Sequence, residues 1–311
     1  MTLAFVFPGQ GSQSVGMQAE LAAAEPAIEE TYQEASDVLG FDLWQLVQQG
    51  PAEKLNETVN TQQAMLAAGV ATWRAWQEAG GPQPAMMAGH SLGEYAALVA
   101  SGALAFVDAV VIVKRRAELM QGAVPAGQGA MAAILGLDDT AVIDVCKAAS
   151  EKGVAEAVNF NSPGQVVVAG DAEAIEYLTG LAREAGARRA LVLPVSVPAH
   201  SSLMRPAGEK LAESILAATF SEPAVPVICA VDGTPYENAA DIRQRMATQV
   251  YSPVRWVTTI NHMSAAGVTD IVECGPGKVL AGLIKRIDRG IAASCIDTFD
   301  ALQNIKDGVS Q

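Results

Sequence analysis

Positive charge is scarce in this sequence. Its 311 residues include 20 lysines and arginines against 34 aspartates and glutamates, which gives a formal net charge of -14. Nucleic acids and anionic membrane surfaces repel so negative a chain, so the composition argues against both as partners. An acidic protein partner would have to meet a local basic patch.

Cysteines are few and lie far apart. The four, Cys146, Cys229, Cys274 and Cys295, include no Cys-x-x-Cys pair and have no histidine nearby. This spacing does not fit a structural metal site or a disulfide framework. We expect reduced, mostly buried thiols in a cytoplasmic protein, and no metal ion.

Uninterrupted apolar runs of membrane-spanning length are also missing. Residues 96–113 are apolar, but polar residues and a glycine interrupt them, so a pair of buried helices is expected. The first seven residues have no basic flank and stop at Pro8, which indicates a first strand rather than a signal peptide. Half of the residues are hydrophobic and 17% are charged, as in globular proteins with a large core.

The most informative stretch is Gly89-His90-Ser91-Leu92-Gly93. An apolar run precedes it and a helix-forming segment follows, which is the order of a nucleophile elbow. In such an elbow a sharp turn from strand to helix needs small flanking residues and raises the serine hydroxyl into a pocket. The helix N-terminus offers free N–H groups and a positive dipole end. We predict that Ser91 attacks a carbonyl; a small-residue turn without chemistry is the alternative.

Strands and helices are expected to alternate up to about residue 124. Residues 3–7 and 85–88 are short apolar runs typical of strands, and residues 63–78 have helical spacing that stops at Gly80-Gly81-Pro82. Two helices follow the elbow. This alternation predicts a parallel sheet with helices on both faces.

The middle of the chain has a different order of elements. A strand, a helix, two strands, a helix and a strand are expected, which is the order of a ferredoxin-like unit. We therefore predict an inserted ferredoxin-like subdomain at residues 125–197. Its strands are expected at 131–135, 154–160, 165–169 and 189–195, and its helices at 139–150 and 172–185.

The last third returns to the larger sheet. A helix is expected at 203–218, strands at 225–230 and 271–274, and a final helix that ends at Ile287. The predicted fold is α/β, with a parallel-sheet, α/β-hydrolase-like large domain at 1–124 and 198–311 and the small subdomain inserted. The last dozen residues are expected to fray.

A serine needs a base, and the chain has three histidines. His200 follows Pro198-Ala199 at the end of the predicted subdomain, where a residue is held at a cleft between domains, and we predict that it is the base. His90 adjoins Ser91 and is expected to pack or position. His262 is expected to be half-exposed on a helix over 256–266. No acidic residue sits in an evident loop before His200, so a backbone carbonyl is expected to orient it.

A tetrahedral intermediate needs two donors for its oxyanion. The Leu92 N–H is one. The second is expected from Gln10, in the glycine-rich turn over 7–13. This turn lacks the Lys-Ser/Thr ending of a phosphate loop and the glycine spacing of a dinucleotide site.

Five motifs together resemble the malonyl-CoA:acyl carrier protein transacylases of bacterial fatty acid synthesis, from residue 5 to about 287. The motifs are Phe7-Pro8-Gly9-Gln10-Gly11-Ser12-Gln13, Gly89-His90-Ser91-Leu92-Gly93-Glu94, Asn159-Phe160-Asn161-Ser162-Pro163-Gly164-Gln165, Val197-Pro198-Ala199-His200 and Glu273-Cys274-Gly275-Pro276-Gly277.

The resemblance implies an acyltransferase that moves malonyl from coenzyme A, through a serine ester, to the phosphopantetheine thiol of acyl carrier protein. It implies Ser91 as nucleophile and His200 as base, with the Gln10 and Leu92 N–H groups as the oxyanion hole. It also implies that Arg116 binds the malonyl carboxylate and that Gln249 helps hold the site together, its segment supplying the acceptor for His200. We expect a cytoplasmic monomer that carries no cofactor of its own.

Physical chemistry agrees with this role for Arg116, because a guanidinium offers a planar fork that matches a carboxylate. Neighbouring residues on a helix point about 100° apart, so Arg115 and Arg116 cannot both face inward. The alternative is that either residue merely covers a helix surface. The acidic carrier protein is expected to dock on basic residues at the cleft mouth, with Arg188, Arg189, Lys285 and Arg286 as candidates.

Other functions stay open on the sequence alone. A serine hydrolase such as a thioesterase would share the elbow, the histidine and the oxyanion donors. A stand-alone acyltransferase of a polyketide synthase would have the same fold and site. A noncatalytic binding protein is a third class, which the joint presence of Ser91 and His200 disfavours.

Overall fold

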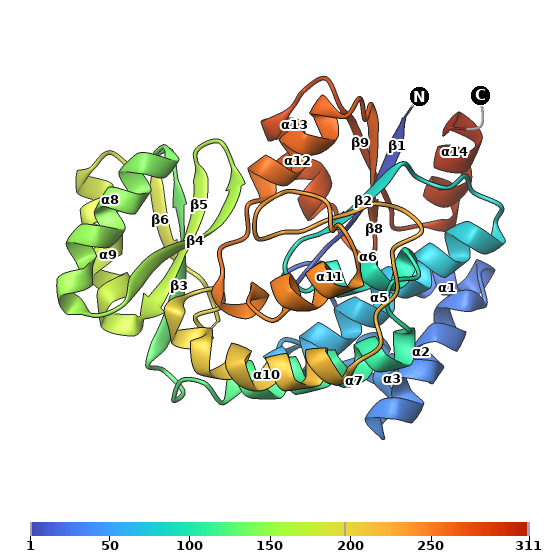
Figure 1. Ribbon diagram of the computed structural model, residues 1–311, viewed down its shortest axis with the longest axis horizontal. Coiled ribbons are helices and arrows are strands. Elements are labelled where there is room, and N and C mark those ends of the chain that lie inside the picture. The colour runs from blue at the N-terminus through green and yellow to red at the C-terminus, as the bar shows by residue number, and fades with distance from the viewer. Residues whose placement is uncertain (1, 196, 310–311) are drawn as a thin grey trace.

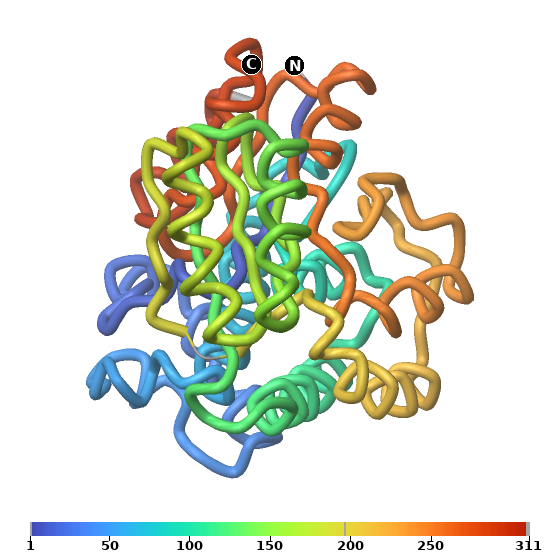
Figure 2. Tube along the Cα trace, turned by 90° about the vertical axis from the view of Figure 1, so that its left-hand side faces the viewer, coloured from blue at the N-terminus to red at the C-terminus, as the bar shows by residue number. Residues whose placement is uncertain are grey.

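The computed structural model describes residues 2–195 and 197–309, and it has two sheets (Figure 1). The larger is parallel, with strand order β7-β2-β1-β8-β9. The smaller is antiparallel, with order β4-β5-β3-β6. Figure 2, turned by 90°, shows the unit around the smaller sheet in front of the rest of the molecule.

The larger sheet is buried on both faces. Along its central strand, Phe5 and Phe7 belong to one hydrophobic core, with helices α5, α6 and α7. Ala4 and Val6 point the other way, into a second core with helices α12 and α13. Its strands are β1 (Leu3–Phe7), β2 (Met86–Gly89), β7 (Val227–Ile228), β8 (Asp270–Cys274) and β9 (Ala292–Ile296).

Most of the helices belong to the part of the chain around this sheet. Five of them, α1 to α5, lie between β1 and β2. The helices are α1 (Ala19–Ala24), α2 (Ala27–Leu39), α3 (Leu43–Gln49), α4 (Ala52–Leu55), α5 (Thr58–Glu78), α6 (Gly93–Ala100), α7 (Phe106–Gln121), α10 (Arg205–Ala217), α11 (Ala239–Met246), α12 (Trp256–Ala265), α13 (Val279–Ile287) and α14 (Phe299–Val309).

The small unit has the expected order of elements. Helices α8 and α9 pack on one face of its sheet, in a core of their own. Met131 and Val167 lie on the opposite face of this sheet, which faces the larger sheet, and they line a cavity between the two sheets. The elements are β3 (Gly129–Leu135), α8 (Asp139–Ala149), β4 (Ala155–Ser162), β5 (Gln165–Asp171), α9 (Ala172–Glu184) and β6 (Arg189–Val192).

All elements of the small unit fall within 125–197, although the proposed domain boundaries themselves stay a prediction. Ser196, near the end of this range, lies outside the described residues. The side chain of Asp138 caps α8 by accepting the Ala141 N–H at 2.8 Å. The four cysteines are free thiols, three buried and Cys295 half-buried.

Three expectations for the elements were wrong. The expected strand over 225–230 is only Val227–Ile228, since the chain turns back after it and the Cys229 N–H bonds to the Thr234 carbonyl oxygen at 2.8 Å instead of extending the pairing with β2. The strand expected to end at Val195 ends at Val192. The last residues do not all fray: up to Val309 they form α14, whose Leu302 is fully buried in the large core. Residues 310 and 311 lie outside the described part.

Candidate active site

Ser91 stands on the predicted turn between β2 and α6, in a left-handed backbone conformation with φ of 52°. Such a φ is strained for a residue with a side chain. The turn is tight: a Cβ atom on Gly93 would lie 2.0 Å from the carbonyl oxygen of Phe7, and one on Gly89 would lie 2.0 Å from the backbone nitrogen of Glu94. Glycine is therefore required on both sides of the turn, as a nucleophile elbow demands.

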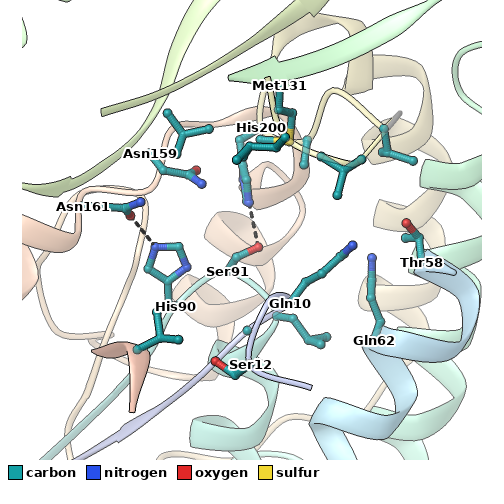
Figure 3. A pocket seen from close by; sticks show the side chains of 18 of the residues that line it. Gln10, Ser12, Thr58, Gln62, His90, Ser91, Met131, Asn159, Asn161 and His200 are labelled. Atoms are coloured by element: carbon teal, nitrogen blue, oxygen red, sulfur yellow. Dashed lines mark hydrogen bonds between the residues drawn. The ribbon is translucent and has the colours of Figure 1, made fainter. Parts of the chain in front are cut away.

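Ser91 and His200 are hydrogen-bonded, with 2.7 Å between Oγ and Nε2 (Figure 3). On the other side of the ring, Nδ1 lies 3.0 Å from the carbonyl oxygens of both Gln249 and Ser252. A carbonyl can only accept, so Nδ1 carries the proton and Nε2 is left to accept from the serine hydroxyl. The expected neutral acceptor for His200 is thus a pair of backbone carbonyls.

His200 is held as a neutral imidazole. Its side chain is buried, and burial lowers its pKa to about 3, with a further lowering from the positive charge of Arg116. The hydrogen bonds to the two carbonyls oppose this shift. A neutral ring beside a serine hydroxyl is a base ready to take its proton.

Arg116 faces inward from α7 and is 1% exposed. Its Nη1 donates to Gln62 Oε1 at 2.7 Å, and its Nη2 lies 3.2 Å from both Ser91 Oγ and Gln249 Oε1. Arg115 points outward, where it pairs with Glu118 at 3.7 Å. The two arginines divide as helix geometry requires, and the inward one reaches the serine.

Two backbone N–H groups are available beside the hydroxyl. Within the described residues, neither Leu92 N–H nor Gln10 N–H donates a hydrogen bond to the protein. The loop that carries Gln10 runs against the elbow: a Cβ atom on Gly9 would lie 2.6 Å from the His90 carbonyl oxygen and 3.7 Å from the Leu92 nitrogen. This arrangement fits an oxyanion hole, although that role stays a prediction.

Gln249 joins the parts of the site, in keeping with its expected role. Its Nε2 donates to the Ser91 carbonyl oxygen at 2.8 Å and to Glu94 Oε2 at 2.7 Å, while its Oε1 accepts from Arg116. Its backbone carbonyl accepts from His200. One residue therefore touches the serine, the histidine and the arginine.

These groups open into one cavity of about 310 Å³ between the two sheets. Gln10, Ser91, Leu92, Arg116 and His200 all line it, and its remaining wall is largely apolar. Figure 3 shows Ser91 and His200 facing each other in the middle of this cavity, with Gln62 and Thr58 on one side and Asn161 on the other. A mostly apolar cavity with a few polar groups at its serine suits a small-molecule substrate.

Comparison with known proteins decides the family. Residues 4–294 match the family described as the acyl transferase domain. The chain belongs to this family of acyltransferases.

Close relatives of this acyltransferase share one name. The malonyl CoA-acyl carrier protein transacylase of Salmonella typhimurium is 54% identical over 299 residues, 96% of this chain and 97% of that protein. The crystal structure of an acyl carrier protein S-malonyltransferase from Vibrio cholerae has a TM-score of 0.96 at 51% identity, and the match covers 98% of this chain and all of that one.

A malonyl-transacylase solved in complex with a type II PKS acyl-carrier protein has a TM-score of 0.98 at 49% identity, and the match covers 99% of this chain and 100% of that one. The resemblance that the five motifs indicate is confirmed. So is the α/β fold class.

The sequence analysis of this acyltransferase missed the role of Gln62. The residue lies on α5, just before the predicted start of that helix, and orients Arg116. A run of polar residues, Asn60 to Gln63, directly before the apolar residues of this helix was the sequence signal that could have found it. Asn161 was quoted only within a motif, and its Oδ1 lies 2.8 Å from His90 Nε2.

The other two histidines lie as expected. His90 turns from the serine hydroxyl toward Asn161 and packs edge-on against Trp256, with 5.4 Å between ring centroids. His262 is half-buried on α12. Within residues 2–195 and 197–309, no three His, Cys, Asp or Glu side chains are grouped to hold a metal ion, and no helix is long and apolar enough to cross a bilayer.

Proposed function

We propose that this acyltransferase moves a malonyl group from coenzyme A to the phosphopantetheine thiol of acyl carrier protein, through an ester on Ser91. One observation carries the proposal: Ser91 Oγ lies within hydrogen-bond distance of both His200 Nε2 and Arg116 Nη2. A nucleophile, its base and a clamp for a carboxylate thus meet at one atom. The names of the close relatives support the same reaction.

In the first half-reaction, Ser91 Oγ attacks the thioester carbonyl as its proton passes to His200 Nε2. The carbonyl oxygen becomes an oxyanion, which accepts hydrogen bonds from the Leu92 and Gln10 N–H groups in this proposal; both residues line the cavity. When the intermediate collapses, the bond to sulfur breaks and His200 returns the proton to the departing thiolate. The malonyl group is then an ester of Ser91.

In the second half-reaction, the carrier's thiol loses its proton to His200 Nε2 and attacks this ester. The bond to Ser91 Oγ breaks, and the serine recovers its proton from His200. Arg116 holds the distal carboxylate of the malonyl group throughout, having exchanged its contact with Ser91 Oγ for the substrate. We propose that no metal or resident cofactor takes part, since His200 and the two N–H groups supply the proton transfer and the charge stabilisation.

The carrier is proposed to dock on a basic hollow beside the cavity. Arg188, Arg189 and Arg286 line this hollow, and Gln165 lines both it and the cavity. Arg286 Nη1 donates to Gln165 Oε1 at 2.7 Å. The hollow supports attraction of an acidic carrier despite the negative charge of the chain. Lys285 lines a different hollow, between α13, β9 and α14, and is left out of this proposal.

Fatty acid synthesis is the pathway we propose. A polyketide pathway is the second candidate, because a relative with 49% identity was solved with a type II PKS acyl-carrier protein. Malonyl-CoA incubated with the enzyme and either a fatty acid carrier or a polyketide carrier separates the two. Coenzyme A release that continues beyond one equivalent per enzyme only when a carrier is present supports transfer, whereas equally fast continued release without a carrier would indicate a thioesterase.

We also propose a cytoplasmic monomer. Among the described residues, the large exposed apolar side chains occur singly, as at Phe41 and Tyr177, or in pairs, Val107 with Val111 on α7 and Leu191 with Val192 on β6. Single side chains and pairs of this kind are common on the surfaces of monomers. Size-exclusion chromatography with light scattering should give a mass close to the 32.3 kDa of one chain.

A further inference from the structure

Arg116 is a buried cation without a direct counter-ion. In the described part of the chain, no Asp or Glu forms an ion pair with it. It donates to the neutral oxygens of Gln62, Ser91 and Gln249, its Cζ lies 5.8 Å from the centre of the Tyr95 ring, and its Nε has no hydrogen-bond partner. A buried charge of this kind is costly unless something nearby balances it.

The nearest carboxylate along the hydrogen-bond network is Glu94, one link away. Glu94 lies in the first turn of α6 and is fully buried. Its Oε2 accepts from Gln249 Nε2 at 2.7 Å, and the Oε1 of the same Gln249 amide accepts from Arg116 at 3.2 Å. A chain of two hydrogen bonds therefore connects the carboxylate to the guanidinium through one amide.

Three hydrogen-bond donors point at the carboxyl oxygens of Glu94. Besides Gln249, the Tyr236 hydroxyl donates to Oε1 at 2.7 Å and the Ala230 N–H donates to it at 2.9 Å. Burial raises the pKa of Glu94, and these three donors act against that rise. The N-terminal end of α6 also favours a negative charge at this position.

We propose that Glu94 is a positioning residue for malonyl selectivity. It fixes the Gln249 amide with Oε1 toward Arg116, and through this amide it balances the positive charge of Arg116 without touching it. This inference rests on the proposed function. Because Glu94 does not contact Arg116 directly, the guanidinium keeps its positive charge and its paired N–H donors for the substrate's carboxylate. A carboxylate in direct contact with Arg116 would compete with malonyl for that fork.

The Glu94→Gln substitution tests this relay with almost no change in shape. Its amide oxygen is expected to stay with the two donors, Tyr236 and Ala230, which turns its NH2 group toward the NH2 group of Gln249. If Gln249 rotates to relieve that clash, its own NH2 group faces Arg116 and its oxygen faces the Ser91 carbonyl. Either arrangement disturbs the contact that holds Arg116.

The experiment compares kcat/KM for malonyl-CoA and for acetyl-CoA, which has no distal carboxylate. Glu94→Gln is expected to lower the malonyl-to-acetyl ratio by about 10- to 100-fold, the effect of losing one hydrogen bond to a charged group. A ratio equal to that of the wild type, or an equal fall with both substrates, would overturn the proposal.

The matched control is Tyr236→Phe. It removes another hydrogen bond from the same carboxylate but leaves the bond between Glu94 and Gln249 in place, so the ratio should stay within about threefold of wild type. A ratio that falls as far as in Glu94→Gln would mean that any damage near Glu94 has this effect, and the proposal would be wrong.

A second variant and a crystal structure separate the possible failures. If Glu94→Gln does not fold, Gln249→Glu is the second variant, because it places a carboxylate directly on Arg116. Its malonyl-to-acetyl ratio must fall by at least the 10- to 100-fold expected for Glu94→Gln. A wild-type ratio in Gln249→Glu would overturn the proposal. If the wild type transfers no malonyl, the proposed function fails by itself. The crystal structure of Glu94→Gln then decides, since an unchanged contact between Arg116 and Gln249 Oε1 would refute the inference for any substrate.

Discussion

Ser91 and His200 both stand in the left-handed region of backbone conformation, with φ of 52° and 67°, and their side chains meet at 2.7 Å. Each such residue costs about 1–3 kcal/mol unless its surroundings enforce the conformation. Around Ser91 the enforcement comes from the packed glycines of the elbow. Around His200 it comes from the Val250 carbonyl oxygen, which accepts the His200 N–H at 2.9 Å, and from the two carbonyls on Nδ1.

Replacing Arg116 with alanine should shift acyl selectivity. An unpaired buried carboxylate costs about 3–5 kcal/mol, so kcat/KM for malonyl-CoA should fall by about 100-fold or more relative to that for acetyl-CoA. Arg115→Ala is the matched control, since that side chain is 50% exposed and pairs only with Glu118. Steady-state kinetics with both thioesters measure this change. An unchanged malonyl-to-acetyl ratio in Arg116→Ala would mean that Arg116 does not bind the malonyl carboxylate.

The pH dependence of the free enzyme should reflect the lowered pKa of His200. Because the ring stays neutral well below pH 6.5, kcat/KM for malonyl-CoA should show no acid limb with a midpoint near 6.5. A profile measured from pH 5 to pH 8 tests this. A limb centred near 6.5 would mean that His200 titrates like an exposed histidine.

The same shift makes the fold less stable in acid. Below pH 6.5 the unfolded chain binds a proton that native His200 refuses, so stability is lost as the pH falls toward about 3. One such histidine contributes a slope of about 1.4 kcal/mol per pH unit to the unfolding free energy. His200→Gln should remove that much of the slope in urea titrations at pH 6.5 and pH 5. An identical slope in both proteins would contradict the assignment.

The elbow should not tolerate a methyl group at Gly93. The added Cβ atom would meet the Phe7 carbonyl oxygen at 2.0 Å, so Gly93→Ala should destabilise the protein by at least about 1–3 kcal/mol. Gly180→Ala on α9 is the control: nothing lies within 4 Å of its added Cβ, and it should stabilise by about 0.5–1 kcal/mol. Urea denaturation compares the two. Equal stability of both variants would mean that the turn is not as tight as described.

Charge reversal in the basic hollow should affect only the carrier. Arg189→Glu combined with Arg286→Glu should raise KM for acyl carrier protein by about tenfold at low salt and leave KM for malonyl-CoA within about twofold. Lys147→Glu is the control, because this exposed residue lies on α8, outside the hollow. If the KM for malonyl-CoA rises as much as the KM for acyl carrier protein, these arginines bind coenzyme A rather than the carrier.

Local patterns in the sequence were enough for β1, a short apolar run, and for the order of elements in the small unit. They failed for α14, whose burial depends on a core built by residues from the start of the chain. The pairing of Ser91 with His200 could be predicted because few histidines compete and a motif marks the serine, whereas the prediction for Arg116 came from the family resemblance. Gln62 and Glu94 were harder to predict, because each acts through another side chain; the polar run from Asn60 to Gln63 is the one sequence signal for Gln62, and no comparable signal marks Glu94.

Intact-protein mass spectrometry after mixing with malonyl-CoA tests the central claim most directly. The account predicts one malonyl adduct on the wild-type protein, none on Ser91→Ala, and loss of the adduct when holo acyl carrier protein is added. An adduct of the same size on Ser91→Ala, or none on the wild type under conditions where malonyl reaches the carrier, would contradict it.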